Sequence, residues 1–234
     1  MDTPTIFDIL DRLAFLHGMP AVALLLTAAF IAIVAWDMRP AIAAVLAQYL
    51  LAGFLFVDVL DPRLAFVYAL AGLFVTAILF ITAWQTNWGR PPPGLTQQEA
   101  TRLGLSRTRR LGRFTVADRS LLRLALAVAV VLAALWLARS PGLLQPVVPA
   151  ELVAYLEPAI VGLVGLGLVG LATSADPLPG GIGLLVFLTG FSLFHGFLDQ
   201  SLAMTVALVV AQFVVALTVA YLAQARYLPA DVLD

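Results

Sequence analysis

Long apolar runs separated by short polar breaks fill most of this chain. Seven such runs lie at about residues 20–36, 40–57, 64–84, 121–138, 157–173, 182–198 and 202–223. Each has roughly the 17–25 mostly apolar residues that a helix needs to cross a hydrocarbon layer about 30 Å thick. The pattern therefore predicts an all-α integral membrane protein with about seven transmembrane helices.

Composition agrees with this pattern and narrows the class of function. The 234 residues are 62% hydrophobic and only 12% charged, and the mean hydropathy is +1.01. A soluble domain carries about 25% charged residues, so this chain has too much apolar surface for water. The apolar runs leave no room for a separate soluble enzyme domain. The absence of cysteine excludes disulfides, thiolate metal ligands and cysteine nucleophiles.

The one long polar passage determines the expected orientation. Residues 85–123 contain 8 of the chain's 13 basic residues, all of them arginine. Arginines beside membrane segments stay preferentially on the cytoplasmic side. Counting outward from this passage puts the N-terminus outside and the C-terminus in the cytoplasm, and the expected location is the cell inner (cytoplasmic) membrane.

This orientation divides the chain into three parts. Residues 1–84 are expected to form an interfacial amphipathic helix, at about residues 5–17, and the first three transmembrane helices. Residues 85–120 form a cytoplasmic Arg-rich loop. Residues 121–234 supply the last four transmembrane helices and a short tail.

The Arg-rich loop has its own local signals. Thr96-Gln-Gln-Glu99 fits a capping box, which predicts a helix from Gln97. Ser106 is placed to cap a second short turn that carries Arg107, Arg109 and Arg110. The basic residues of the loop are expected to set the topology and to contact anionic lipid headgroups. They are Arg102, Arg107, Arg109, Arg110 and Arg113. With a net charge of −1, the chain gives no case for nucleic-acid binding.

Two prolines suggest boundaries in the second half. Glu157-Pro158 is interpreted as the entry to the fifth transmembrane helix, because proline suits the first helical turn. Glu157 is then expected to be solvated at a helix end. Pro179-Gly180-Gly181 is interpreted as part of a compact turn before the sixth helix.

Polar side chains inside the apolar runs are the candidates for function. Gln48 and Gln212 lie near mid-membrane depth, where an amide needs a hydrogen-bond partner on another helix or a buried water. They are interpreted either as bridges between helices or as stepping stones in a polar path. His195 and Asp199 are four residues apart and share a helix face. They are either a proton-handling pair or an interfacial pair at a helix end.

Other motifs give no chemistry. Gly165-Leu-Gly167-Leu-Val-Gly170 matches a dinucleotide pattern, but it lies inside a membrane helix and lacks the strand that this fingerprint requires. With Gly162, these glycines are expected to allow close helix packing. His17 is the only histidine besides His195, so no metal site is expected. No catalytic triad can be assembled and no cofactor is implied.

The last two runs resemble a known family. Leu188-Thr-Gly190-Phe-Ser192-Leu-Phe resembles the second helix of the small K-type subunit of respiratory complex I. Residues 207–222 resemble the third helix of that family. The outline of the whole chain is similar to the E-type membrane component of hydrogenase-4 complexes, with relatives in multi-subunit cation/proton antiporters. The resemblance implies a subunit without a redox centre, working beside other membrane subunits.

The chain departs from the family at two positions. The family places glutamates, which carry protons laterally, where this sequence has Ser192 and Gln212. The spacing between the two positions is also shorter, so a gap must be assumed. The resemblance therefore implies a subunit that scaffolds a proton path rather than one that carries protons.

The expected function is a non-catalytic membrane subunit of a larger ion-translocating or energy-converting complex. Its expected partners are the lipid bilayer and other membrane subunits. A stand-alone small transporter or channel is the first alternative. An integral-membrane enzyme is the weaker alternative, because no set of catalytic side chains can be assembled.

Overall fold

The computed structural model describes residues 18–57, 62–89, 108–111, 114–139, 150–198 and 201–227. These residues form seven long helices, a short 3-10 turn at Asn87–Gly89 and a small hairpin. The helices are α2 (Met19–Val34), α3 (Met38–Phe56), α4 (Pro62–Gln85), α6 (Asp118–Leu137), α7 (Ala150–Thr173), α8 (Pro177–Leu198) and α9 (Leu202–Tyr227). Six are long and apolar enough to cross a membrane, and α2 is a shorter apolar helix. The chain is an all-α integral membrane protein.

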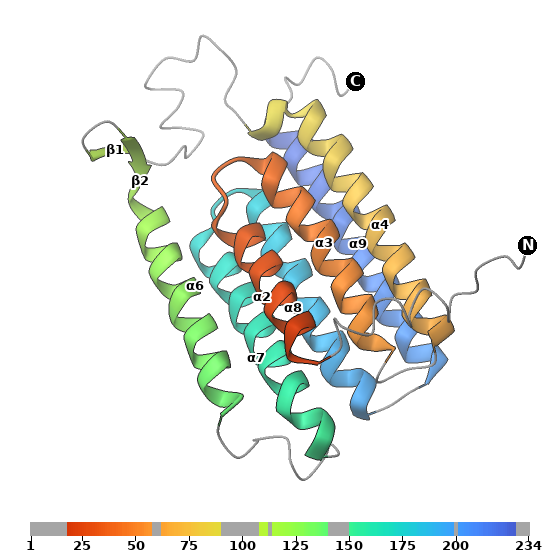
Figure 1. The fold of residues 1–234 in the computed structure, drawn as a ribbon. Coiled ribbons are helices and arrows are strands. Elements are labelled where there is room, and N and C mark those ends of the chain that lie inside the picture. The colour runs from red at the N-terminus through yellow and green to blue at the C-terminus, as the bar shows by residue number, and fades with distance from the viewer. Residues whose placement is uncertain are drawn as a thin grey trace, which may run out of the picture.

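The helices pack in two layers (Figure 1). In one layer α2, α3 and α4 lie side by side, and in the other α6, α7, α8 and α9 follow in chain order. The layers meet where α2 packs on α6 and α7, α3 on α8, and α4 on α9. As a result α8 lies in the middle of the bundle and contacts helices of both layers.

Glycines bring α7 and α8 closest together. A Cβ atom on Gly167 would lie 2.5 Å from the backbone nitrogen of Phe187, and one on Gly170 would lie 2.9 Å from the Cα atom of Gly183. Such distances require a residue without a side chain, and they let the two backbones touch. The prediction that these glycines serve helix packing is confirmed. Gly162 and Gly165 play the same part against Leu26 of α2 and Val130 of α6.

The bundle has two ends, named here after one residue of each. At the Phe56 end α3 and α8 end and α9 begins. At the Arg123 end α2, α7 and α9 end, and α6 and α8 begin. Exposed tryptophans mark both ends: Trp36 and Trp84 at the Arg123 end, and Trp136 at the Phe56 end. This placement is typical of the aromatic belts at membrane–water interfaces.

Two expected boundaries are wrong. Helix α7 begins at Ala150, so Pro158 lies inside it rather than at its start; membrane helices tolerate an internal proline where neighbouring groups satisfy the freed carbonyl. Helix α8 begins at Pro177. Proline has no backbone N–H, and the first residue of a helix needs none for the hydrogen bonds of the helix. The Gly180 amide donates to the Asp176 carbonyl at 3.0 Å, so Gly180-Gly181 continue the helix instead of forming a turn.

The loop also differs from expectation where it is described. Arg109 and Arg110 lie in strand β1 (Thr108–Leu111), which pairs antiparallel with β2 (Phe114–Ala117), and not in a short helical turn. The sequence Phe-Thr-Val in β2 is rich in β-formers and offers β1 a partner. The interfacial helix at 5–17, the capping-box helix, Arg102, Arg107 and Arg113 lie outside the described residues.

Candidate functional site

A cluster of polar side chains lies in the bundle interior where α4, α8 and α9 meet. Gln212 of α9 donates through its Nε2 atom to the Tyr68 hydroxyl of α4 at 3.0 Å and to the Ser192 hydroxyl of α8 at 3.2 Å. These side chains are 1%, 1% and 4% exposed, respectively. Thr189, one turn before Ser192, lies beside the Tyr68 hydroxyl. Tyr68, Thr189, Ser192 and Gln212 are called the polar cluster below.

The depth of Gln212 follows from helix geometry. It is ten residues beyond Leu202, the first residue of α9, and at 1.5 Å per residue this is about 15 Å along the axis. That is about half of a hydrocarbon layer 30 Å thick. The structure thus brings Ser192 and Gln212, two of the sequence candidates, into direct contact inside the bundle.

Aromatic packing positions Tyr68. Its ring lies 4.4 Å from the ring of Phe56 and 5.8 Å from that of Tyr49, both on α3. Tyr49 approaches α4 at Gly72, where a Cβ atom would meet the Tyr49 Cβ at 2.3 Å. Because Gly72 has no side chain, α3 comes close enough for its aromatic rings to hold Tyr68 against α8 and α9.

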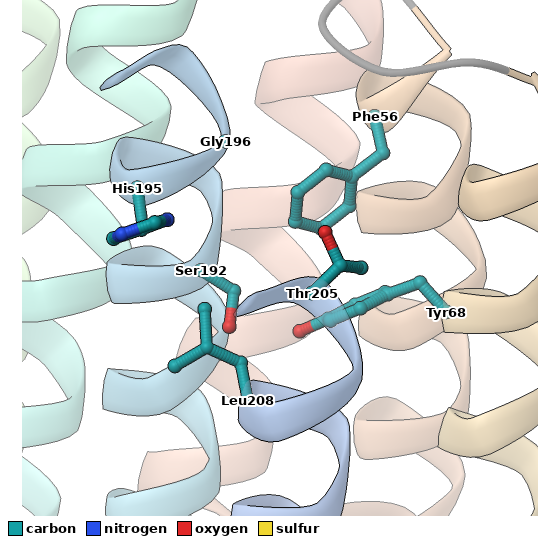
Figure 2. A pocket seen from close by; sticks show the side chains of 7 residues that line it. All are labelled: Phe56, Tyr68, Ser192, His195, Gly196, Thr205 and Leu208. Carbon is teal, nitrogen blue, oxygen red and sulfur yellow. The ribbon is translucent and has the colours of Figure 1, made fainter. Parts of the chain in front are cut away.

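A cavity lies beside the polar cluster, on the side of the Phe56 end. It is lined by Phe56, Tyr68, Ser192, His195, Gly196, Thr205 and Leu208. The space open to the centre of a water molecule is about 10 Å³, which is about what one water requires. Figure 2 shows the Tyr68 hydroxyl directed toward the Ser192 hydroxyl among the residues that line the cavity.

His195 lies at the rim of this cavity. Its ring is half-buried and set apart from the two hydroxyls, and it lies 6.3 Å from the ring of Phe191 one turn earlier. Phe191 is itself 37% exposed, so this face of α8 turns outward. Asp199, the expected partner of His195, lies outside the described residues, so their pairing stays a prediction.

Gln48 lies apart from these contacts. It is completely buried in α3, and neither its Nε2 nor its Oε1 atom has a hydrogen-bond partner among the described residues. The same holds for the Tyr49 hydroxyl and for the Oε1 atom of Gln212. A buried polar atom without a partner costs about 1–3 kcal/mol, so the bundle interior around α3 carries unsatisfied polarity that apolar packing does not relieve.

Glu157 is a residue that sequence reasoning misjudged. It was expected to be solvated at a helix end, but it is 2% exposed and lies seven residues inside α7. The error came from starting the fifth helix at Pro158. A buried carboxylate is costly unless it interacts with other polar groups, and Glu157 has such an interaction.

Arginines tie helices together at the Arg123 end. Arg123 of α6 donates to Thr173 Oγ1 at 3.0 Å and to Ser174 Oγ at 3.0 Å, and also to the Ile33 carbonyl at 3.4 Å. A cation at the C-terminal ends of α2 and α7 also opposes their helix dipoles favourably. Arg226 of α9 forms an ion pair with Asp176 at 3.1 Å. None of these contacts was foreseen, because each joins residues far apart in sequence.

The chemistry open to the polar cluster follows from its groups. Amides and hydroxyls donate and accept hydrogen bonds but do not gain or lose a net proton at physiological pH. Within the described residues, no three histidine or carboxylate side chains gather in a way that would hold a metal ion. The cluster is therefore suited to bind water and to join helices.

In comparisons with known proteins, no family model, no curated protein and no solved structure matches the chain.

Proposed function

We propose that this chain is a non-catalytic subunit of a larger ion-translocating or energy-converting complex in the cell's inner membrane. Its role there is to scaffold helices around a proton path that other subunits supply. The observation that carries the proposal is the contact between Ser192 and Gln212. In the family that the last helices resemble, both positions are glutamates, and here a hydroxyl and an amide at these positions bind each other directly.

The substitution changes what the site does. Two carboxylates so close together repel each other and share protons, which suits proton transfer. An amide and a hydroxyl form a neutral hydrogen bond that fixes α8 against α9. Tyr68 extends the same bond to α4, so three helices are held at one point. This supports a structural role near mid-membrane, where a carrier would need a group that titrates.

The outer surface supports a subunit in a membrane assembly. Large apolar side chains of α6 are exposed along most of its length: Leu121, Leu122, Leu124, Leu126, Val128, Leu132, Leu135 and Trp136. Lipid or neighbouring membrane helices cover such a surface.

Purification in mild detergent tests this proposal first. A tagged full-length chain is expected to co-elute with other membrane proteins in constant stoichiometry. Elution of the chain alone, over a range of mild detergents, would contradict it.

Reconstitution separates the subunit from a stand-alone transporter. The purified chain alone in liposomes is expected to give no proton flux above that of protein-free vesicles. A flux that the His195→Ala variant abolishes would instead establish a transporter. The Arg139→Ala variant, changed at an exposed position of the same end, is the matched control.

A further inference from the structure

The cavity beside the polar cluster lies within two helical turns of the Phe56 end. Phe56 is the last residue of α3, Gly196 is two residues before the end of α8, and Thr205 lies in the first turn of α9. Tyr68 and Ser192 line its inner part. The cavity therefore lies between the polar cluster and one end of the bundle.

The Tyr68 and Ser192 hydroxyls have hydrogen-bonding capacity beyond their bonds to Gln212. The Gln212 amide uses its Nε2 atom to donate to both Tyr68 and Ser192. Each hydroxyl then still has a proton to donate. Both side chains line a space of about the size of one water (Figure 2), and a buried water needs two to four such polar contacts.

On the other side of the cluster the inward face of α9 is apolar. Along one face of α9, Thr205 and Leu208 line the cavity and Gln212 ends it. The next residues of that face, Ala216 and Val219, are 0% and 6% exposed. Leu79 of α4 and Leu185 of α8 are also fully buried. Buried polar groups on this side of the cluster reach Gln48 of α3. Between Gln48 and the Arg123 end, the buried residues of α3 are apolar: Ala41, Ile42, Ala44 and Val45.

We propose that the cavity between α4, α8 and α9 is a one-sided water site. A water molecule bound by the Tyr68 and Ser192 hydroxyls exchanges with solution at the Phe56 end and not through the apolar interior toward the Arg123 end. The polar cluster is thereby hydrated from a single side of the membrane.

Two tyrosines of the unmodified chain give the first test. Tyr68 lines the cavity and Tyr49 does not, yet they are 1% and 0% exposed. Radiolysis of water in the intact membrane protein labels side chains that lie beside a bound or exchanging water. Tyr68 is expected to be modified several-fold faster than Tyr49. Equal rates, or faster modification of Tyr49, would overturn the proposal.

Single cysteines test the direction of access, because the chain has no cysteine of its own. The probe is the silver ion, applied to membrane vesicles of both orientations, with the remaining thiols counted after denaturation. Leu208→Cys is expected to be blocked from the side that also blocks Ser201→Cys, at the start of α9. Ala216→Cys lies two turns deeper on the same face. Its rate of reaction is expected to be about one tenth of that of Leu208→Cys or lower, because the silver ion would have to lose its hydration in an apolar interior.

Thr205→Cys is a second variant, for the case that Leu208→Cys does not fold. Thr205 lies at the half-buried mouth of the cavity. Reaction at Thr205→Cys without reaction at Leu208→Cys would overturn the proposal, as would equal reaction at Leu208→Cys and Ala216→Cys. These results do not depend on whether partner subunits co-elute. The labelling experiments can therefore contradict the water site without contradicting the proposed function, and co-elution can contradict the proposed function without contradicting the water site.

Discussion

The Nε2 atom of Gln212 lies 3.0 Å from the Tyr68 hydroxyl oxygen, although 144 residues separate them in the chain. The bond joins α9 to α4 across the two layers of the bundle, and both side chains are 1% exposed. Its second branch to Ser192 adds α8. One side chain thus fixes the relative positions of three helices.

The Gln212→Leu variant removes both bonds at little cost in volume. We expect a loss of about 1 kcal/mol of stability, since hydrogen bonds between membrane helices are worth about that much. Thermal unfolding in detergent measures it. Gln224→Leu is the matched control: Gln224 also joins α9 to α4, through Gln85 at 2.6 Å, but at an exposed site. An equal loss of stability in both variants would show that the buried Gln212 bond stabilises the protein no more than the exposed Gln224 bond does.

Gly167→Ala should separate α7 from α8. The added methyl group would lie 2.5 Å from the Phe187 backbone nitrogen, and a backbone atom has no rotamer by which to move away. We expect a loss of about 2 kcal/mol or more, as for other overpacked interiors. Gly180→Ala is the control, because its nearest neighbour would be the Ser174 Cβ at 3.8 Å. If the two variants melt at the same temperature, the close approach of α7 and α8 is not what stabilises this pair.

Arg123→Lys should loosen α6 despite keeping the charge. Lysine cannot reproduce the fork that reaches Thr173, Ser174 and the Ile33 carbonyl together. We expect a stability loss of about 1.5–3 kcal/mol, the usual contribution of a hydrogen bond that involves a charged group. Proteolysis of the membrane-embedded protein and thermal unfolding both report on it. Arg139→Lys, at an exposed position of the other end, should leave both measurements unchanged.

The expected topology has its own measurement. Cysteines at Ser106 and at Asp2 can be labelled with a membrane-impermeant maleimide in intact cells, with no native cysteine to interfere. We expect label at residue 2 from outside and none at residue 106, because the Arg-rich loop stays on the cytoplasmic side. Labelling of residue 106 from outside would refute the orientation of every helix.

The sequence by itself determined the number and approximate limits of the membrane helices. Apolar runs of spanning length are a local property, and the bilayer requires each to satisfy its own backbone hydrogen bonds as a helix. The same reasoning located Gln48 and Gln212 as polar groups at depth. It misplaced the start of α7 because Pro158 fits both the first turn and the interior of a membrane helix.

Only the tertiary structure decided which of those polar groups meet. Two apolar helices pack equally well in many rotations when lipid and side chains are alike in polarity, so periodicity says little about partners. Three features depend on how the seven helices are arranged. They are the hydrogen bond from Gln212 to Tyr68, the burial of Glu157, and the hydrogen bonds from Arg123 to α2 and α7. Gly72 and Gly167 set how close those helices come. The sequence identifies these residues as candidates, but the packing of their helices determines which of them are in contact.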